Sequence, residues 1–290
     1  MFDSLKPLLI QSIGRSGTTL LMQLVGTSPQ ILFDRVYPFE VRYLTYLLRW
    51  AQMLEQDWDQ SSNWNPSANA NLPPGQTLGP FPYKESQLWH GDELWPRCFR
   101  AAWREFSSIA IARGRANGGD EVLPLYYAEK TPRWVPTLLR RAIPYNSILL
   151  VRDPRDIFLS ITEFDKKRGF PGFNRRANDD DWSFAERFVE GCRQSLKTIR
   201  EEEAYPHSIL VKYERLVLNL TNESQRLSER LGVRFDTDVV EKQTTEFIHH
   251  MTSNTARESV ERWRRELPAE LNEFFVTKFH EDLQHFGYET

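Results

Sequence analysis

Two segments of this chain combine residue types that could hold phosphate groups. In the first, residues 8–21, an apolar run is followed by a turn from Gly14 to Gly17 and by an apolar helical pattern that opens with Thr18 and Thr19. This order predicts a strand, a loop and a helix N-terminus, where free backbone N–H groups and the helix dipole attract an anion. Glycine lets the backbone approach such a ligand closely. The segment therefore predicts a phosphate site, although a turn of this kind can also simply join a strand to a helix.

The same loop lacks the cation that nucleoside triphosphatases use. Their loop reads G-x-x-x-x-G-K-[ST], in which the Lys reaches the β- and γ-phosphates and the hydroxyl binds Mg²⁺. When Gly17 and Thr19 are aligned with the end of that pattern, Thr18 takes the place of the Lys and Ser12 that of the first Gly. The cation here is Arg15, within the loop. The segment thus predicts a P-loop-like nucleotide cradle without triphosphate and magnesium chemistry.

A second segment, residues 146–160, has a similar organisation. An apolar run up to Val151 predicts a buried strand, and the sequence R-D-P-R-D that begins at Arg152 opens a helix carrying Ser160. Ligands of open α/β sheets bind beyond the carboxyl ends of the strands, where Arg152 is expected. Ser160 lies about two helical turns further on, so both side chains can hold one anionic group. The alternative is that the charged residues of this segment form exposed ion pairs, which are common and weak.

Together the two segments resemble the sulfotransferases that use 3′-phosphoadenosine 5′-phosphosulfate (PAPS). In that family a loop of the form [R/K]-S-G-T-T holds the 5′-phosphosulfate, and residues 15–19 match it without departure. A second motif, R-D-P-R-D-x-x-x-S, holds the 3′-phosphate through its Arg and Ser, which are Arg152 and Ser160 here. An Arg at the start of the first loop is similar to the tyrosylprotein and related bacterial sulfotransferases.

The resemblance covers nearly the whole chain and is weak only between residues 58 and 123. Tyr213 stands in a segment similar to the family's Y-E-x-L sequence, whose Tyr lies against the nucleotide. Residues 262–263 and 286–288 resemble the R-W and F-G-Y signatures that close the family's sequences. The resemblance implies PAPS as donor, its product 3′-phosphoadenosine 5′-phosphate (PAP), and no metal. The cofactor-binding candidates are Gly14, Arg15, Ser16, Gly17, Thr18, Thr19, Arg152, Ser160, Tyr213, Ser253 and Arg262.

Sulfuryl transfer requires in-line geometry, charge stabilisation at the leaving phosphate and a base for the acceptor proton. Arg15 and the loop amides are expected to neutralise the leaving phosphate. The family places a Lys at a strand end facing the bridging oxygen, and Lys130 occupies that position. A solvated Lys at a strand terminus is the alternative for Lys130.

The base is assigned to Glu40. Small-phenol sulfotransferases carry a His two residues after the strand-end Lys, but that position is Pro132 here. Tyrosylprotein sulfotransferases instead use a Glu downstream of the phosphosulfate loop, and Glu40 fits that position on a helix expected over residues 39–56. A Glu that only favours the helix dipole is the alternative. His249 and His250 are further candidates for the base.

The composition is typical of one globular domain. The chain has 290 residues, 40% of them hydrophobic and 27% charged, and shows no division into two units. Cys98 and Cys192 lack metal-site or disulfide spacing. A net charge of −3 argues against a nucleic-acid partner. No apolar run reaches about 18 residues and the first strand begins close to Met1, so the sequence suggests neither a membrane span nor a signal peptide and indicates a cytoplasmic protein.

Apolar runs and helical patterns alternate along the chain, which predicts an α/β fold with a central parallel sheet flanked by helices. Strands are expected at 7–13, 31–33, 123–128, 147–151 and 208–212. Helices are expected at 18–27, 39–56, 94–116, 133–142, 155–167, 184–203, 222–231, 259–266 and 269–286. Residues 57–91, with Trp58, Trp64 and Trp89 among polar residues, are either a surface loop pinned by its tryptophans or a lid or acceptor-binding wall. A polar loop at 169–181 could border the same mouth.

These features predict a metal-independent sulfotransferase that moves a sulfuryl group from PAPS to a hydroxyl or, in second place, an amine. The acceptor would be a small molecule, a glycan or a peptide. One alternative is a nucleotide or adenylylsulfate-type kinase, which the missing P-loop Lys disfavours. The other is a catalytically inactive PAP-binding protein, which the presence of Lys130 and Glu40 disfavours.

Overall fold

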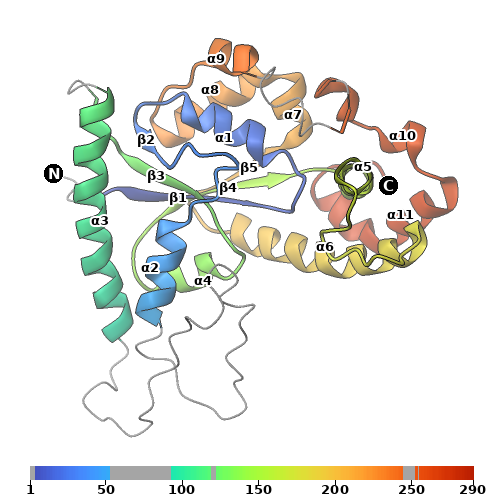
Figure 1. The fold of residues 1–290 in the computed structure, drawn as a ribbon, viewed down its shortest axis with the longest axis horizontal. Coiled ribbons are helices and arrows are strands. Elements are labelled where there is room, and N and C mark those ends of the chain that lie inside the picture. Colours follow the sequence, from blue (N-terminus) through green and yellow to red (C-terminus); the bar gives the residue numbers. More distant parts are fainter. Residues whose placement is uncertain (1–3, 53–92, 119–121, 244–251, 254) are drawn as a thin grey trace, which may run out of the picture.

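A computed structural model describes residues 4–52, 93–118, 122–243, 252–253 and 255–290 (Figure 1). Within these residues one parallel sheet has the strand order β2-β3-β1-β4-β5. Its strands are β1 (Lys6–Ser12), β2 (Ile31–Leu32), β3 (Tyr126–Lys130), β4 (Asn146–Val151) and β5 (Ser208–Lys212). The predicted α/β fold with a central parallel sheet is therefore confirmed.

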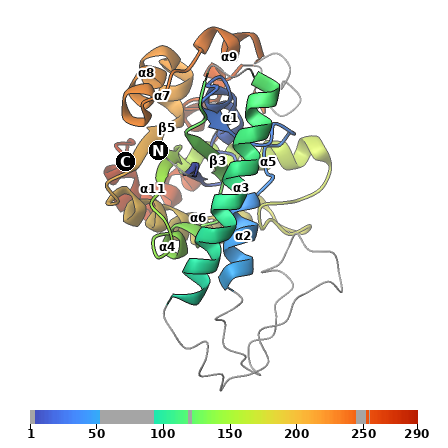
Figure 2. The same ribbon diagram turned by 90° about the vertical axis from the view of Figure 1, so that its left-hand side faces the viewer.

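Helices cover both faces of this sheet. Figure 1 shows α1, α8 and α9 on one side and α2, α4 and α6 on the other, and Figure 2, turned by 90°, brings α3 to the front. The described helices are α1 (Thr18–Gly26), α2 (Tyr43–Gln52), α3 (Leu94–Gly118), α4 (Val135–Leu139), α5 (Pro154–Arg168), α6 (Asp181–Glu203), α7 (Tyr213–Leu218), α8 (Leu220–Leu231), α9 (Thr237–Gln243), α10 (Trp263–Glu266) and α11 (Ala269–His285), with a 3-10 turn at Arg257–Ser259. None of them is long and apolar enough to cross a membrane.

The strands alternate their side chains between the two helical layers, as the period of two requires. On β1, Leu8 and Ile10 pack with the α1 side chains, whereas Leu9 packs with Tyr127 and with Leu44 of α2. Every residue of β4 is buried. Burial on both faces explains why the strands could be recognised in the sequence as continuous apolar runs.

The strand order places the ends of three strands around one point. After β1 in the centre, the chain returns to β3 on one side of it and to β4 on the other. Such a change of direction opens a crevice beyond the carboxyl ends of the strands, where ligands of open α/β sheets bind. The loops that follow β1, β3 and β4 therefore meet at the same edge of the sheet.

Several element boundaries differ from the predictions. The strand expected at 123–128 begins at Tyr126 and continues to Lys130, which pairs with Ile10. Pro124, which has no N–H to donate, lies before the ladder. The helix expected at 259–266 is broken by Glu261, whose φ of 52° lies outside the right-handed helical region. Helices α7 and α9 were not predicted. Residues 57–91, His249 and His250 lie outside the described residues.

Candidate active site

The loop between β1 and α1 has the backbone of an anion site. Gly17 is the N-cap of α1 with a φ of 90°, and a Cβ added there would lie 2.2 Å from Cδ2 of Tyr213. Glycine is thus required both by the left-handed backbone and by the close approach of the Tyr213 ring. Because Gly17 has no side chain to cap the helix, the first-turn N–H groups of α1, including those of Thr18 and Thr19, are left available for an anion.

Arg15 connects this loop to α5. Its backbone is also left-handed, with a φ of 67°, and its guanidinium lies 4.3 Å from the centre of the Phe164 ring. Its Nε donates a hydrogen bond of 3.3 Å to Oγ of Ser160. The two residues that the sequence assigned to separate phosphate motifs are therefore in direct contact.

Arg152 completes this cluster from the end of β4. Its Nη1 donates to the carbonyl of Arg15 at 3.0 Å and its Nη2 to the carbonyl of Ser259 at 2.7 Å. The same guanidinium lies 4.5 Å from the centre of the Tyr213 ring, whose hydroxyl is 2.7 Å from Oγ of Ser259. Arg15, Arg152, Ser160 and Tyr213 are thus brought together, as their assignment to one nucleotide requires.

The charged residues after Arg152 are buried, so the alternative of exposed ion pairs is wrong. Asp153 caps α5 by accepting the N–H of Arg155 at 2.9 Å and pairs with its guanidinium at 2.7 Å. That guanidinium also stacks on Trp263 at 3.5 Å, and Asp156 accepts the N–H of Trp263 at 2.9 Å. The motif therefore also holds the C-terminal segment against the start of α5.

The cluster carries positive charge in a partly dehydrated environment. The pKa of Arg15 is lowered to about 10, mainly by burial and also by the neighbouring Arg152 guanidinium. Among the described residues, Nε of Arg152 and Oγ of Ser16 are buried with no hydrogen-bond partner. Two adjacent guanidinium groups repel each other, and two buried polar atoms lack hydrogen bonds. An anionic ligand would offset the repulsion and accept the missing hydrogen bonds.

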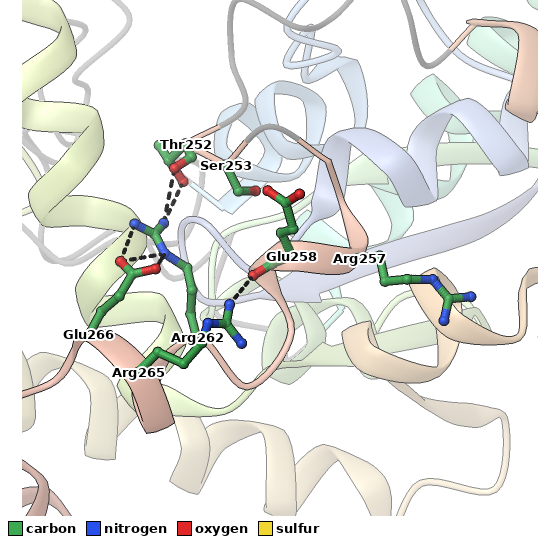
Figure 3. A pocket seen from close by; sticks show the side chains of 7 residues that line it. All are labelled: Thr252, Ser253, Arg257, Glu258, Arg262, Arg265 and Glu266. Atoms are coloured by element: carbon green, nitrogen blue, oxygen red, sulfur yellow. Dashed lines mark hydrogen bonds and ion pairs between the residues drawn. The ribbon is translucent and has the colours of Figure 1, made fainter.

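A cavity of about 600 Å³ adjoins the cluster (Figure 3). Figure 3 shows the Arg262 guanidinium between Glu266, with which it pairs at 2.7 Å, and the carbonyl of Thr252, to which it donates at 3.1 Å. Oγ1 of Thr252 lies 3.2 Å from Oγ of Ser160, which links this cavity to the Arg15 cluster. The cavity is lined by Thr252, Ser253, Arg257, Glu258, Arg262, Arg265 and Glu266. Ser253 and Arg262 therefore lie where a ligand held by Ser160 could extend.

Lys130 is buried at the end of β3, so the alternative of a solvated Lys is wrong. Its Nζ donates to the carbonyl of Pro38 at 2.7 Å and lies 3.9 Å from Oε1 of Glu40. The pKa of Lys130 is lowered to about 8, mainly by burial and also by Arg42, against the opposing effect of the Glu40 carboxylate. The structure thus brings together the two residues proposed from the sequence as leaving-group stabiliser and base.

Glu40 lies in a loop and not on a helix, which corrects the sequence analysis. Phe39 has a φ of 62°, so the right-handed helix cannot start there, and α2 begins only at Tyr43. The Glu40 side chain is 49% exposed and its Oε2 lies 3.5 Å from Nη2 of Arg42. Stabilisation of a helix dipole is therefore not its role.

Tyr37 connects the Lys130 end of the site with the Arg15 cluster. Burial raises the pKa of Tyr37, the Arg15 guanidinium lowers it and the Glu40 carboxylate raises it, so both charges act on one ring. Arg15 and Glu40 are therefore both near enough to Tyr37 to influence its hydroxyl group.

Sequence reasoning missed several residues that build this site. Thr252 and Ser259 contribute oxygen atoms to the cluster from the C-terminal segment, and Phe164 supports Arg15. None of these three residues had a local signal, because each reaches the cluster only through contacts between distant segments. No group of three or more His, Cys, Asp or Glu side chains in the described part of the chain is arranged to hold a metal ion.

Residues 5–287 match the family model of the sulfotransferase domain, so the chain belongs to this family. Among solved structures, the sulfotransferase domain from the curacin biosynthetic pathway is similar at 16% identity, over 99% of this chain and 98% of that chain, with a TM-score of 0.54. The corresponding domain of the Synechococcus PCC 7002 olefin synthase shares 17% identity over 99% and 96% of the two chains, with a TM-score of 0.51.

Mouse sulfotransferase SULT7A1, solved in complex with PAP, is similar at 13% identity over 96% of this chain and 85% of that chain, with a TM-score of 0.53. These identities are low, so the three structures establish the likeness in fold. No curated protein sequence matches this chain.

Proposed function

We propose that this protein transfers the sulfuryl group of PAPS to a hydroxyl group of an acceptor molecule, without a metal ion. The observation that carries the proposal is the contact of Arg15 with both Arg152 and Ser160 beside the uncapped N-terminus of α1. Two phosphate-binding motifs far apart in the sequence thereby form one cationic cluster. A nucleotide with phosphate groups at both its 5′ and 3′ positions is the ligand that matches two such motifs.

The residues present fit this nucleotide. Residues 14–19 would hold the 5′-phosphosulfate, and Arg152 and Ser160 the 3′-phosphate, with the buried Nε of Arg152 and Oγ of Ser16 available as further contacts. Tyr213 would lie against the nucleotide, since its ring already packs on Arg152. Ser253 and Arg262 would border it from the adjoining cavity. When bound, PAPS supplies a sulfuryl group attached to a phosphate leaving group.

The protein's own groups have complementary roles in this proposal. The Glu40 carboxylate takes the proton of the acceptor hydroxyl, and Nζ of Lys130 holds a proton near the oxygen that leaves. Arg15 offsets the charge of the leaving phosphate. The distance of 3.9 Å between Lys130 and Glu40 leaves no space for another group between these two atoms, so their ion pair must open when the site is filled. Glu40 can move because it is half exposed and pairs with Arg42.

The donor is tested by ligand-induced stabilisation. PAP should raise the melting temperature by mass action, by the equivalent of about 2.7 kcal/mol at one hundred times its Kd, whereas ATP with Mg²⁺ should do little. Equal or greater stabilisation by ATP with Mg²⁺ would instead favour a kinase.

The transfer itself is tested by mass spectrometry of products formed from isotope-labelled PAPS and a panel of hydroxyl and amine acceptors. The expected result is a labelled sulfate ester whose formation a metal chelator does not reduce. Strong PAP binding without transfer to any acceptor would indicate a PAP-binding protein that has lost catalysis.

A further inference from the structure

The buried carboxylate of Glu129 has no role in the function proposed above. Glu129 precedes Lys130 on β3 and is only 2% exposed. Side chains alternate along a strand, so Glu129 shares the sheet face of Tyr127, which packs with α2 and α3. Burial of a charged group in this apolar layer is costly unless hydrogen bonds replace its contacts with water.

Glu129 caps a helix that is distant in the sequence. Its Oε2 accepts the N–H of Leu44 at 2.8 Å, and its Oε1 accepts the N–H of Thr45 at 2.9 Å together with the Thr45 hydroxyl. Both residues belong to the first turn of α2, whose N–H groups have no partner within the helix. The carboxylate also interacts favourably with the positive end of the helix dipole.

The next residue on β3 holds the other end of the same segment. Nζ of Lys130 donates to the carbonyl of Pro38 and lies 3.9 Å from Glu40. Glu129 and Lys130 therefore anchor residues 44–45 and residue 38, and Glu40 lies between these two anchors. No strand or helix is formed between Leu32 and Tyr43, so these contacts take the place of regular backbone pairing.

We infer that Glu129 is a positioning residue, which fixes the start of α2 and thereby keeps Glu40 beside Lys130 for proton transfer. The inference rests on the proposed function, because it takes Glu40 and Lys130 as the reacting pair. A rearrangement of about 1 Å at a reacting group can cost roughly a hundredfold in rate. Loss of the Glu129 contacts should therefore affect turnover more than donor binding.

The test compares Glu129→Gln with Glu202→Gln. Glu202 is also 2% exposed and accepts hydrogen bonds from Tyr145 and Arg140, but it lies on α6, outside the site. In Glu129→Gln an amide NH₂ faces a backbone N–H, so one donor loses its acceptor. We expect kcat to fall roughly 10- to 100-fold with the KM for PAPS unchanged, and Glu129→Asp, which keeps the carboxylate, to retain more of kcat. Glu202→Gln should lose thermal stability to a similar extent while keeping kcat.

A second measurement does not depend on turnover. Because the Glu40 carboxylate raises the pKa of Lys130, displacement of Glu40 should lower that pKa. Titration of the Lys130 side-chain signal by NMR should show this decrease in Glu129→Gln, with Glu40→Gln as the reference for complete loss of the carboxylate and Glu202→Gln as the control without effect. Absence of PAPS turnover in the wild type would contradict the proposed function alone. An unchanged Lys130 pKa in Glu129→Gln, or equal losses of kcat in the two Gln variants, would overturn the positioning role.

Discussion

The two ends of the candidate site are built in different ways. At the Arg15 end, both arginine side chains pack on aromatic rings and hydrogen-bond to neighbouring groups, and Arg152 and Ser160 are buried. At the Glu40 end, the carboxylate is half exposed and lies in a loop that Glu129 and Lys130 hold to the sheet by hydrogen bonds, while Phe39 packs against the core.

This difference suggests a division of labour. A preorganised cluster suits a donor that is always the same molecule, since little ordering is required when it binds. A loop held at its two ends can move enough to open the Lys130–Glu40 pair when the proposed acceptor binds. Substitutions at the first end should therefore change donor binding, and substitutions at the second end should change turnover.

The largest effect is expected for Glu40→Gln. This variant keeps the shape of the side chain but cannot take a proton, and removal of a general base typically lowers the rate by about 10²- to 10⁴-fold. The Kd for PAP should stay near the wild-type value, because Glu40 is not assigned to the nucleotide. Steady-state kinetics and calorimetric titration with PAP measure the two quantities.

Glu201→Gln is the matched control for this variant. Glu201 is 64% exposed and pairs with a lysine, Lys197, but it lies on α6, outside the site. Full turnover in Glu40→Gln would remove Glu40 as the base and make His249 and His250 the next residues to test.

A smaller effect, confined to donor binding, is expected at the other end of the site. Ser160→Ala and Arg152→Ala remove contacts to the proposed 3′-phosphate, and a hydrogen bond to a charged group contributes about 1.5–3 kcal/mol. Both variants should weaken PAP binding and spare adenosine 5′-phosphosulfate, which lacks that phosphate. Calorimetric titration with the two nucleotides gives the comparison.

Ser147→Ala serves as the control for loss of a buried hydroxyl, since Ser147 lies on β4 and not in the cluster. Equal losses of affinity for both nucleotides in Ser160→Ala would show that Ser160 has a structural role only.

The contribution of Glu129 should also appear in the pH dependence of stability. Burial raises its pKa to about 7 in the folded state, above the value of 4.5 for an exposed Glu, so the folded protein binds this proton more tightly. The free energy of unfolding should therefore decrease as the pH rises from about 4.5 to 7, by at most about 3 kcal/mol from this group. Denaturant titrations should show a smaller decrease in Glu129→Gln. An equal decrease of the unfolding free energy with pH in both proteins would contradict the raised pKa of Glu129.

The pH profile of turnover should report on Lys130. Because its pKa is lowered to about 8, turnover should decline at higher pH as Nζ loses its proton, by no more than about tenfold per pH unit. In Lys130→Arg the guanidinium stays charged, so the decline should move to higher pH even if the maximal rate is lower. If turnover of this variant declines at the same pH as that of the wild type, the decline is caused by a group other than Lys130.

Much of the donor end could be predicted because its motifs are local. Residues 15–19 and 152–160 each follow a strand that is buried on both faces, and such strands are visible as apolar runs. The carboxyl ends of parallel strands meet at one edge of a sheet, so the motifs had to meet as well. The contact between Arg15 and Ser160 was not visible, because it depends on the left-handed backbone of Arg15.

The acceptor end was predicted less well. The sequence proposed Glu40 as the base, which stays a prediction, but it placed this residue on a helix, since nothing local indicates that Phe39 has a positive φ. The start of α2 is set by Glu129, which is 85 positions from Leu44. Because the capping residue is so distant in the sequence, no motif next to α2 predicts where this helix begins.

The sequence by itself therefore determined the α/β order and the family, because both depend on neighbouring residues and on a repeating apolar pattern; the phosphate-binding role of the two motifs stays a prediction. Only the tertiary structure decided which groups partner Arg152, how Ser259 and Thr252 reach the cluster, and where Glu40 lies. These features depend on contacts between segments that are distant along the chain. Their geometry is fixed only when the sheet and its covering helices have packed.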